Sequence, residues 1–130
     1  MADSQRFAFT KIAVSDLNAQ SAFYSAVLGQ VVRHRVSGGE GDDAFSEVVM
    51  GSPDGDGPSL LLVHHLHRET PPPGEAVLGF AVADVERVVG AAEKAGGVVC
   101  APPRSLPGQA LRVAQLQDPE GHALEIIQHI

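Results

Sequence analysis

One pattern of residues occurs twice in this chain, and the repeat limits its fold more than any other feature. Asp16 precedes Gly29 by thirteen residues, and Asp84 precedes Gly97 by the same interval. A Pro-Asp-Gly turn follows later in the first copy, and a Pro-Glu-Gly turn follows in the second. The chain is therefore predicted to contain two structural copies of one unit.

Each copy is predicted to fold as one strand, one helix and three further strands. Ser15 or Asp16 in the first copy and Asp84 in the second can cap a helix, because a short side chain with an oxygen accepts the free N–H groups of the first turn. Apolar residues recur on one face of each following stretch, and a glycine ends it. Strands are expected at 7–14, 31–36, 45–51, 59–65, 77–83, 98–101, 111–117 and 123–129, with loops at 37–43, 52–58 and 102–109.

The two copies are expected to form one domain over residues 1–130. The first module covers about 5–66 and the second about 76–130. Between them, three consecutive prolines in segment 67–75 predict a stiff connector, because proline fits neither a helix interior nor a central strand. The predicted class is α+β, with two curved mixed sheets around a concave cavity and a helix on the convex side of each sheet.

Composition excludes several classes of partner. The net charge of −7 argues against binding to nucleic acid or to an anionic membrane. No apolar run is long enough to span a membrane and no signal peptide is visible, so we expect a cytoplasmic protein. The single cysteine, Cys100, excludes an internal disulfide, and its apolar neighbours predict a buried position.

Both copies carry motifs of a known family. Residues 13–17 (AVSDL), followed by Phe23-Tyr24, are similar to the first module of the vicinal oxygen chelate superfamily. Residues 80–85 (FAVADV) and 118–122 (DPEGH) are similar to its second module. This superfamily includes glyoxalase I, methylmalonyl-CoA epimerase, extradiol dioxygenases, fosfomycin resistance enzymes and bleomycin resistance proteins. The resemblance implies the glyoxalase/bleomycin-resistance fold and a homodimer, but it leaves the activity open.

The same resemblance implies where a metal would bind. Members that bind a metal use His, Gln or Glu near the start of each first strand and in each fourth strand. Those positions here are Phe9, Leu61, Val77 and Glu125, and moving the alignment from Leu61 to Leu62 changes nothing. Because a typical site needs three protein ligands, the expectation is that the chain has no metal site and no cofactor. A divalent metal in altered geometry is the alternative.

Strand alternation places small residues on the face expected to line the cavity. The small residues could leave room for a ligand, or they could allow a helix or strand to pack closely. The sequence does not distinguish these two explanations. Ala13 also occupies the position where glyoxalase I carries an arginine for glutathione, so glutathione chemistry loses support. The face is expected to carry Phe9, Lys11, Ala13, Val77, Gly79, Ala81 and Ala83.

Glu125 is the main polar candidate. A tight hairpin at 118–121 would place Ala114 opposite Glu125 and Arg112 diagonally across from it, within reach of an ion pair. The pair could stabilise the fold, because an unpartnered buried carboxylate is costly. Alternatively, Glu125 binds a ligand, acts as a general base or, least favoured, binds a metal.

The histidines and the tyrosine carry weaker signals. His65 shares a strand face with Val63 and could lie at the edge of the pocket. It could also be exposed, or it could bind a displaced metal together with His67 and Glu125. His122 is expected to be exposed in its turn, and Tyr24 is expected to pack with its hydroxyl at the edge.

Three functions are compatible with these features. The first is a metal-independent protein that binds or sequesters an apolar or aromatic natural product or antibiotic, and so confers resistance. The second is an enzyme, a glyoxalase-like lyase, an isomerase or epimerase, or a dioxygenase relative, that uses Glu125 with or without a metal. The third is an interaction module whose cavity is filled. The residues expected to contact a ligand are Phe9, Lys11, Ala13, Leu61, Val63, His65, Val77, Gly79, Arg112 and Glu125.

Overall fold

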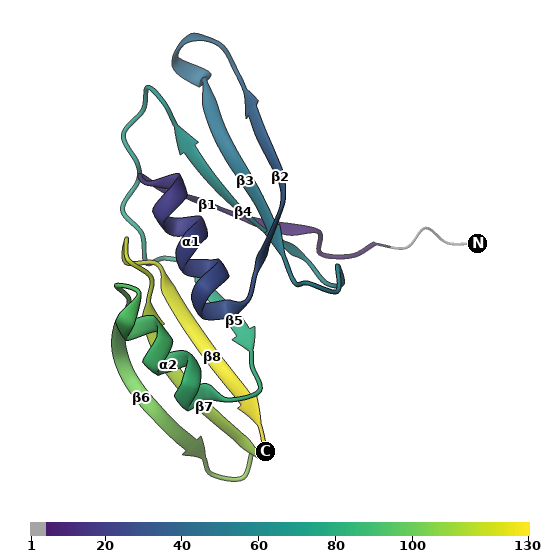
Figure 1. Ribbon diagram of the computed structural model, residues 1–130, viewed down its shortest axis with the longest axis vertical. Helices are drawn as coiled ribbons and strands as arrows, with labels where there is room; N and C mark the ends of the chain where they lie inside the picture. Colours follow the sequence, from purple (N-terminus) through teal and green to yellow (C-terminus); the bar gives the residue numbers. More distant parts are fainter. Residues whose placement is uncertain (1–4) are drawn as a thin grey trace, which may run out of the picture.

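The computed structural model of the protein describes residues 5–130, so residues 1–4 of the predicted domain lie outside the described part. It contains two βαβββ modules, one above the other in Figure 1. The first comprises β1 (Phe9–Ala13), α1 (Leu17–Leu28), β2 (Val31–Gly38), a short 3-10 turn (Gly41–Asp43), β3 (Phe45–Gly51) and β4 (Ser59–His65). The second comprises β5 (Val77–Ala81), α2 (Val85–Lys94), β6 (Val98–Leu106), β7 (Leu111–Gln117) and β8 (Ala123–His129).

Each module forms a four-stranded mixed sheet with the same strand order. The orders are β1-β4-β3-β2 and β5-β8-β7-β6, and the first and fourth strands of each module run parallel. Lys11 pairs with Leu61 in the first sheet, and Gly79 pairs with Glu125 in the second. The predicted α+β class is confirmed, and Leu61 and Glu125 occupy equivalent positions in the two copies.

The predicted helix caps are present in both modules. The Asp16 carboxylate accepts the Ala19 N–H at 2.9 Å, and the Asp84 carboxylate accepts the Arg87 N–H at 3.2 Å. Gly29 ends α1 with a φ of 64°, a left-handed conformation that glycine adopts without strain. The two helices therefore begin at equivalent points and lie on the same side of their sheets (Figure 1).

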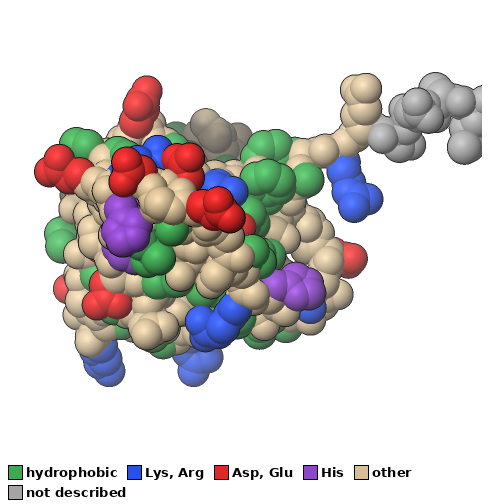
Figure 2. Space-filling model, turned by 90° about the horizontal axis from the view of Figure 1, so that it is seen from above, with side chains coloured by type: hydrophobic (Ala, Val, Ile, Leu, Met, Phe, Trp, Pro, Cys, Tyr) green, Lys and Arg blue, Asp and Glu red, His purple; other side chains and the backbone are tan. Residues whose placement is uncertain are grey.

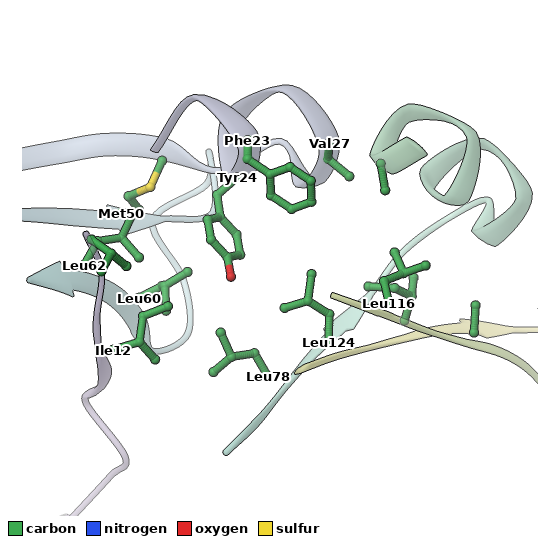
Figure 3. Packing of buried hydrophobic residues seen from close by; sticks show 14 of the residues in the cluster. Ile12, Phe23, Tyr24, Val27, Met50, Leu60, Leu62, Leu78, Leu116 and Leu124 are labelled. Atoms are coloured by element: carbon green, nitrogen blue, oxygen red, sulfur yellow. The ribbon is translucent and has the colours of Figure 1, made fainter. Parts of the chain in front are cut away.

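A single hydrophobic core joins the two modules. It lies between the helices and the sheets and contains residues of both copies (Figure 3). Tyr24 of α1 is fully buried, and its ring lies 6.1 Å from that of Phe80 in the second module. In Figure 3 its hydroxyl points away from α1, towards the strands that carry Leu60, Leu78 and Leu124. The modules are therefore held together by continuous apolar packing.

Two predictions about the second module are wrong. Cys100 is exposed, and β6 continues to Leu106 through two prolines that were expected in a loop. β6 is an edge strand, and its pairing with β7 is irregular between Ala101 and Arg104, where the two prolines lie. Burial alternates along β6 from Val98 to Ala101, and Cys100 lies on the exposed side together with Val98.

Within the part of the chain that the structure describes, no helix has both the length and the apolar character needed to cross a membrane.

Candidate functional site

The surface of the two sheets opposite the helices, here called the open face, carries the residues predicted to contact a ligand. Ile12 enters the core, so its neighbours on β1 point to the other side. Phe9 is 49% exposed and Val77 is 60% exposed, although both are large and apolar. The first strand of each module contributes three residues: Phe9, Lys11 and Ala13 from β1 and Val77, Gly79 and Ala81 from β5.

The four positions that bind metal in the superfamily all lie on the open face. Leu61 is buried among its neighbours at 8% exposure, and Glu125 is half-buried. Phe9, Leu61 and Val77 have no lone pair to offer, so this set of side chains does not fit a divalent metal. Among residues 5–130, no three His, Cys, Asp or Glu side chains come together in a way that could hold a metal. His65, His67 and Glu125 therefore do not form the displaced site.

Glu125 lies between two uncharged neighbours. It pairs with Gly79 on β5 and with Gln115 on β7. The Gln115 side chain in turn accepts a hydrogen bond from Arg104 at 3.0 Å. No salt bridge involves Glu125 within residues 5–130. Its carboxylate is therefore free to accept a hydrogen bond from a ligand.

The predicted ion pair between Arg112 and Glu125 is wrong. The residue opposite Glu125 is Gln115, one position beyond the predicted one. Because side chains alternate along a strand, this shift moves Arg112 to the helix side, where its guanidinium lies 2.7 Å from the Glu86 carboxylate of α2. The cause is a connection of five residues, 118–122, in place of the tight hairpin that was expected.

A second carboxylate, Glu47 on β3, lies on the open face and was missed from the sequence. It is only 7% exposed, and its Oε2 lies 2.9 Å from Nζ of Lys11. This contact has the distance of an ion pair without the geometry of a hydrogen bond. Burial of Val48 and Met50 on the helix side would have indicated the orientation of Glu47.

The two histidines at the end of β4 are each engaged with the protein. Nη2 of Arg68 lies 3.0 Å from Nδ1 of His65, and Nδ1 of His64 lies 3.0 Å from the carbonyl oxygen of Val14. His65 is half-buried at the end of the open face. Its predicted place at the edge of the ligand site is compatible with this geometry and stays a prediction.

A buried polar cluster around Asp118 was also missed. Asp118 is 1% exposed and accepts hydrogen bonds of 2.7 Å from the Tyr24 hydroxyl and from Gln20 Nε2. His122 belongs to the same cluster at 8% exposure, so the exposed position predicted for it is wrong. The Tyr24 hydroxyl, predicted at the edge, is also buried. The Asp118 carboxylate thus pairs with the Tyr24 hydroxyl and the Gln20 amide nitrogen, while the buried Gln20 Oε1 makes no hydrogen bond within the described residues.

Burial and hydrogen bonding shift the pKa values in this cluster. Burial raises the pKa of Tyr24, and the nearby Asp118 carboxylate raises it further. Burial would also raise the pKa of Asp118, but the hydrogen bonds from His122 and Tyr24 outweigh it and lower that pKa. The hydrogen bond with Asp118 raises the pKa of His122 against the opposing effect of burial. The cluster therefore favours an ionised Asp118 and a protonated His122.

The turn that carries this cluster attaches the second module to the first. The Glu120 carboxylate accepts the N–H groups of Ser15 and Asp16 at 2.7 and 2.8 Å. Nε2 of His122 lies 3.1 Å from the carbonyl oxygen of Ala13. These contacts fix the corner between β1 and α1 against the second module, and so fix how the two halves of the open face are oriented.

Several cavities lie where the modules meet in the described part of the chain, and two of them are larger than about 300 Å³. One of 670 Å³ is lined by His122, Glu120, Glu69 and prolines 71–73 of the connector. The other, of 340 Å³, lies between β5 and segment 52–60. Glu125 lines neither cavity, but Ala13 lines the first and Gly79 and Ala81 line the second, so both border the open face.

Charge is distributed unevenly over the surface. Figure 2 looks onto the end of the molecule that carries the β2–β3 hairpin, where acidic side chains gather around histidine. Lys and Arg side chains in this view lie mainly along the lower edge. With a net charge of −7, this end attracts cations more than anions.

Comparisons with known proteins agree with this architecture. The family model "Glyoxalase/Bleomycin resistance protein/Dioxygenase superfamily" matches residues 6–126. No curated protein sequence matches the chain.

Solved structures show the same fold. A glyoxalase family protein from Bacillus cereus has a TM-score of 0.81 at 20% identity, with 100% of this chain and 99% of that chain covered. A glyoxylase/bleomycin resistance protein/dioxygenase domain from Frankia sp. has a TM-score of 0.75 at 23% identity, with 98% and 100% covered. Glyoxalase I from Zea mays has a TM-score of 0.78 at 21% identity, with 97% of this chain but 45% of that chain covered. The match over residues 6–126 and the shared fold show that this chain belongs to the glyoxalase/bleomycin resistance protein/dioxygenase superfamily.

Proposed function

We propose that the protein binds an apolar or aromatic small molecule on its open face without a metal. It would then act like a bleomycin-resistance type protein, sequestering a natural product or antibiotic. One observation carries this proposal: three of the four metal-ligand positions hold hydrocarbon side chains in matched register on that face. Sequestration requires affinity alone, which apolar contact supplies.

The exposed side chains of the open face support this function. Phe9 and Val77 leave apolar area in contact with water. A ligand that covers this area gains about 25 cal/mol of binding free energy per Å². A Cβ at Gly79 would meet only a backbone oxygen at 4.0 Å, so there is space above β5. Glu125 would supply the polar contact that orients the ligand.

Binding sites usually enclose most of a ligand, so the open face needs a cover. The homodimer expected from the family resemblance is the proposed cover, and the cytoplasm is the proposed location. Sedimentation velocity would measure the oligomeric state, and a monomer at micromolar concentration would contradict the dimer.

A fluorescence titration tests the binding function. Protein treated with EDTA would be titrated with N-phenyl-1-naphthylamine, an uncharged aromatic probe that brightens in apolar surroundings. We expect saturable binding that added Zn²⁺ or Ni²⁺ leaves unchanged. The variant Gly79→Leu, which fills the space above β5, should weaken it at least tenfold. Binding that appears only with metal, or that ignores Gly79→Leu, would refute the proposal.

An enzyme that uses Glu125 as a general base is the second candidate. It is favoured by the absence of an ion-pair partner for Glu125 within residues 5–130. The test is exchange of hydrogen for deuterium next to the carbonyl group in a panel of small carbon acids, followed by NMR in D₂O. Catalysed exchange that Glu125→Gln abolishes, while probe binding persists, would establish the enzyme over the simple binder.

A further inference from the structure

A charged pair on the open face of the first module has no charged counterpart in the second. Glu47 pairs with Val63 in the first sheet, and Val113 pairs with Ile127 at the same place in the second. Lys11 likewise corresponds to Gly79. The first module thus holds a lysine and a carboxylate where its twin has no charge, and the same fold forms in both. The fold itself therefore does not require this pair.

The stability of the folded protein hardly explains why the Lys11–Glu47 ion pair is present. Glu47 is 7% exposed, so its carboxylate has lost most of its water, and its buried Oε2 makes no hydrogen bond. A buried ion pair of this kind often contributes no more than well-packed apolar residues of similar size. The twin module has apolar Val113 at this position, buried at 3% exposure. The charged pair is better explained by what Lys11 can do on the open face.

The ammonium of Lys11 is held in place with donors to spare. Its side chain is 45% exposed, and Glu47 is its one ion-pair partner among the described residues. Lysine carries three N–H donors and no acceptor. The ring of Phe9 lies 5.9 Å from Nζ, so an apolar wall stands beside the charge. Because Glu47 fixes the ammonium, a ligand that binds it pays less of the entropy of ordering a lysine.

We infer that Lys11, positioned by Glu47, donates a hydrogen bond to an oxygen acceptor of an aromatic ligand on the open face. The acceptor is a sulfonate, carboxylate, phenolate or carbonyl oxygen. This inference rests on the proposed function, and it adds the class of ligand: an aromatic body that carries such an oxygen at the end facing the first module.

Two probes with one aromatic body test this inference. 8-Anilinonaphthalene-1-sulfonate is N-phenyl-1-naphthylamine with one added sulfonate. In the wild-type protein the sulfonate probe should displace the uncharged probe and bind about tenfold more tightly, as expected for a hydrogen bond to a charged group. Lys11→Met should abolish that tenfold preference, measured as the ratio of the affinities of the two probes for the same variant. Lys11→Arg should restore most of it.

Two further variants separate this effect from general charge and from misfolding. Lys94→Met removes an exposed lysine at the end of α2 and should keep the full preference for the sulfonate probe. Lys11→Met alone leaves Glu47 buried without a cation and could unfold the chain. The double variant Lys11→Met/Glu47→Met replaces both charges by apolar side chains of similar length, and it should fold and lose the preference.

The outcomes separate this inference from the proposed function. If the uncharged probe binds but the sulfonate adds nothing, or if the preference survives in both Lys11→Met variants, the role of Lys11 is refuted and the binding function stands. If neither probe binds the wild-type protein, both are refuted. A preference that is lost in the double variant and kept in Lys94→Met supports the inference.

Discussion

Nε2 of His122 lies 3.1 Å from the carbonyl oxygen of Ala13, and this contact connects the last turn of the second module to the first strand of the first. The other ring nitrogen, Nδ1, lies 2.9 Å from the Asp118 carboxylate. A carbonyl and a carboxylate can only accept hydrogen bonds, so both ring nitrogens must carry a proton to satisfy both. The joint between the modules therefore uses a protonated histidine, in agreement with the raised pKa of His122.

The first prediction concerns the pH dependence of stability. Because the folded pKa of His122 is raised, its stabilising effect is complete below the unfolded value of about 6.5 and is lost as pH rises through the folded pKa. The groups that face it are Asp118 and Glu120 of its own turn, Asp16 of the α1 corner, Tyr24 of α1 and Glu69 of the connector. Urea unfolding from pH 6 to pH 9 should show a decline in the wild type.

His122→Gln is the control for this prediction. It cannot titrate, so the difference in unfolding free energy between wild type and variant should be largest near pH 6 and should shrink as pH rises. An equal difference at pH 6 and pH 9 would show that the proton on His122 does not matter.

The second prediction concerns Asp118. Asp118→Asn keeps the shape of the side chain but replaces one acceptor oxygen by a donor that faces Tyr24, Gln20 or His122. Breaking a buried charge pair costs about 3–5 kcal/mol, and we expect a loss in unfolding free energy of at least 3 kcal/mol. The exposed Asp56→Asn should change it by less than about 0.5 kcal/mol. Similar losses in both variants would contradict a special role for Asp118.

The third prediction compares two glycines of the second module. A Cβ at Gly97 would lie 3.0 Å from the carbonyl oxygen of Gln117 and 3.1 Å from both the Ala92 oxygen and the Phe23 ring. Gly97→Ala should therefore lower the unfolding free energy by about 1–3 kcal/mol. Gly90 lies inside α2 with nothing within 4 Å, so Gly90→Ala should raise it by about 0.5–1 kcal/mol. Thermal unfolding measures both, and changes of the same sign would refute this account of packing.

The fourth prediction restores donors at the superfamily positions. In the triple variant Phe9→His/Leu61→Glu/Val77→His, three new ligands would join Glu125 on the open face. Because three protein ligands suffice for a divalent metal, the variant should bind one Zn²⁺ or Ni²⁺ per chain. The wild-type protein should bind less than a tenth of a metal ion per chain. Elemental analysis of both proteins, purified without an affinity tag, measures this ratio. Stoichiometric metal in the wild type would overturn the metal-free account.

The repeat was sufficient to predict the fold, because spacing between caps, glycines and turns reports local structure directly. Asp16 and Asp84 cap their helices as predicted, and Leu61 and Glu125 occupy equivalent positions. Side-chain alternation then placed Phe9, Lys11 and the other selected residues of β1 and β5 on one face, and that placement holds. These features depend only on neighbours in sequence and on the periodicity of a strand.

The contacts of the site depended on details that the sequence does not specify. The length of the turn after Gln117 sets the register of β7 and β8, and one residue of difference moved Arg112 to the helix side. The Asp118 cluster was missed because Tyr24 and His122 are 98 residues apart and meet only when the modules pack together. Glu47 was not predicted because it lies on β3, which carries none of the positions that bind metal in the superfamily.

The measurement that tests the central claim most directly is a map of the binding site by NMR. Uniformly ¹⁵N-labelled, EDTA-treated protein would be titrated with N-phenyl-1-naphthylamine while backbone amide shifts are recorded. The account predicts saturable changes concentrated on the open face, at Lys11, Gly79, Ala81 and Glu125. Changes concentrated at Ser15, Asp16 and Glu120, beside the 670 Å³ cavity, or no saturable change at all, would contradict it.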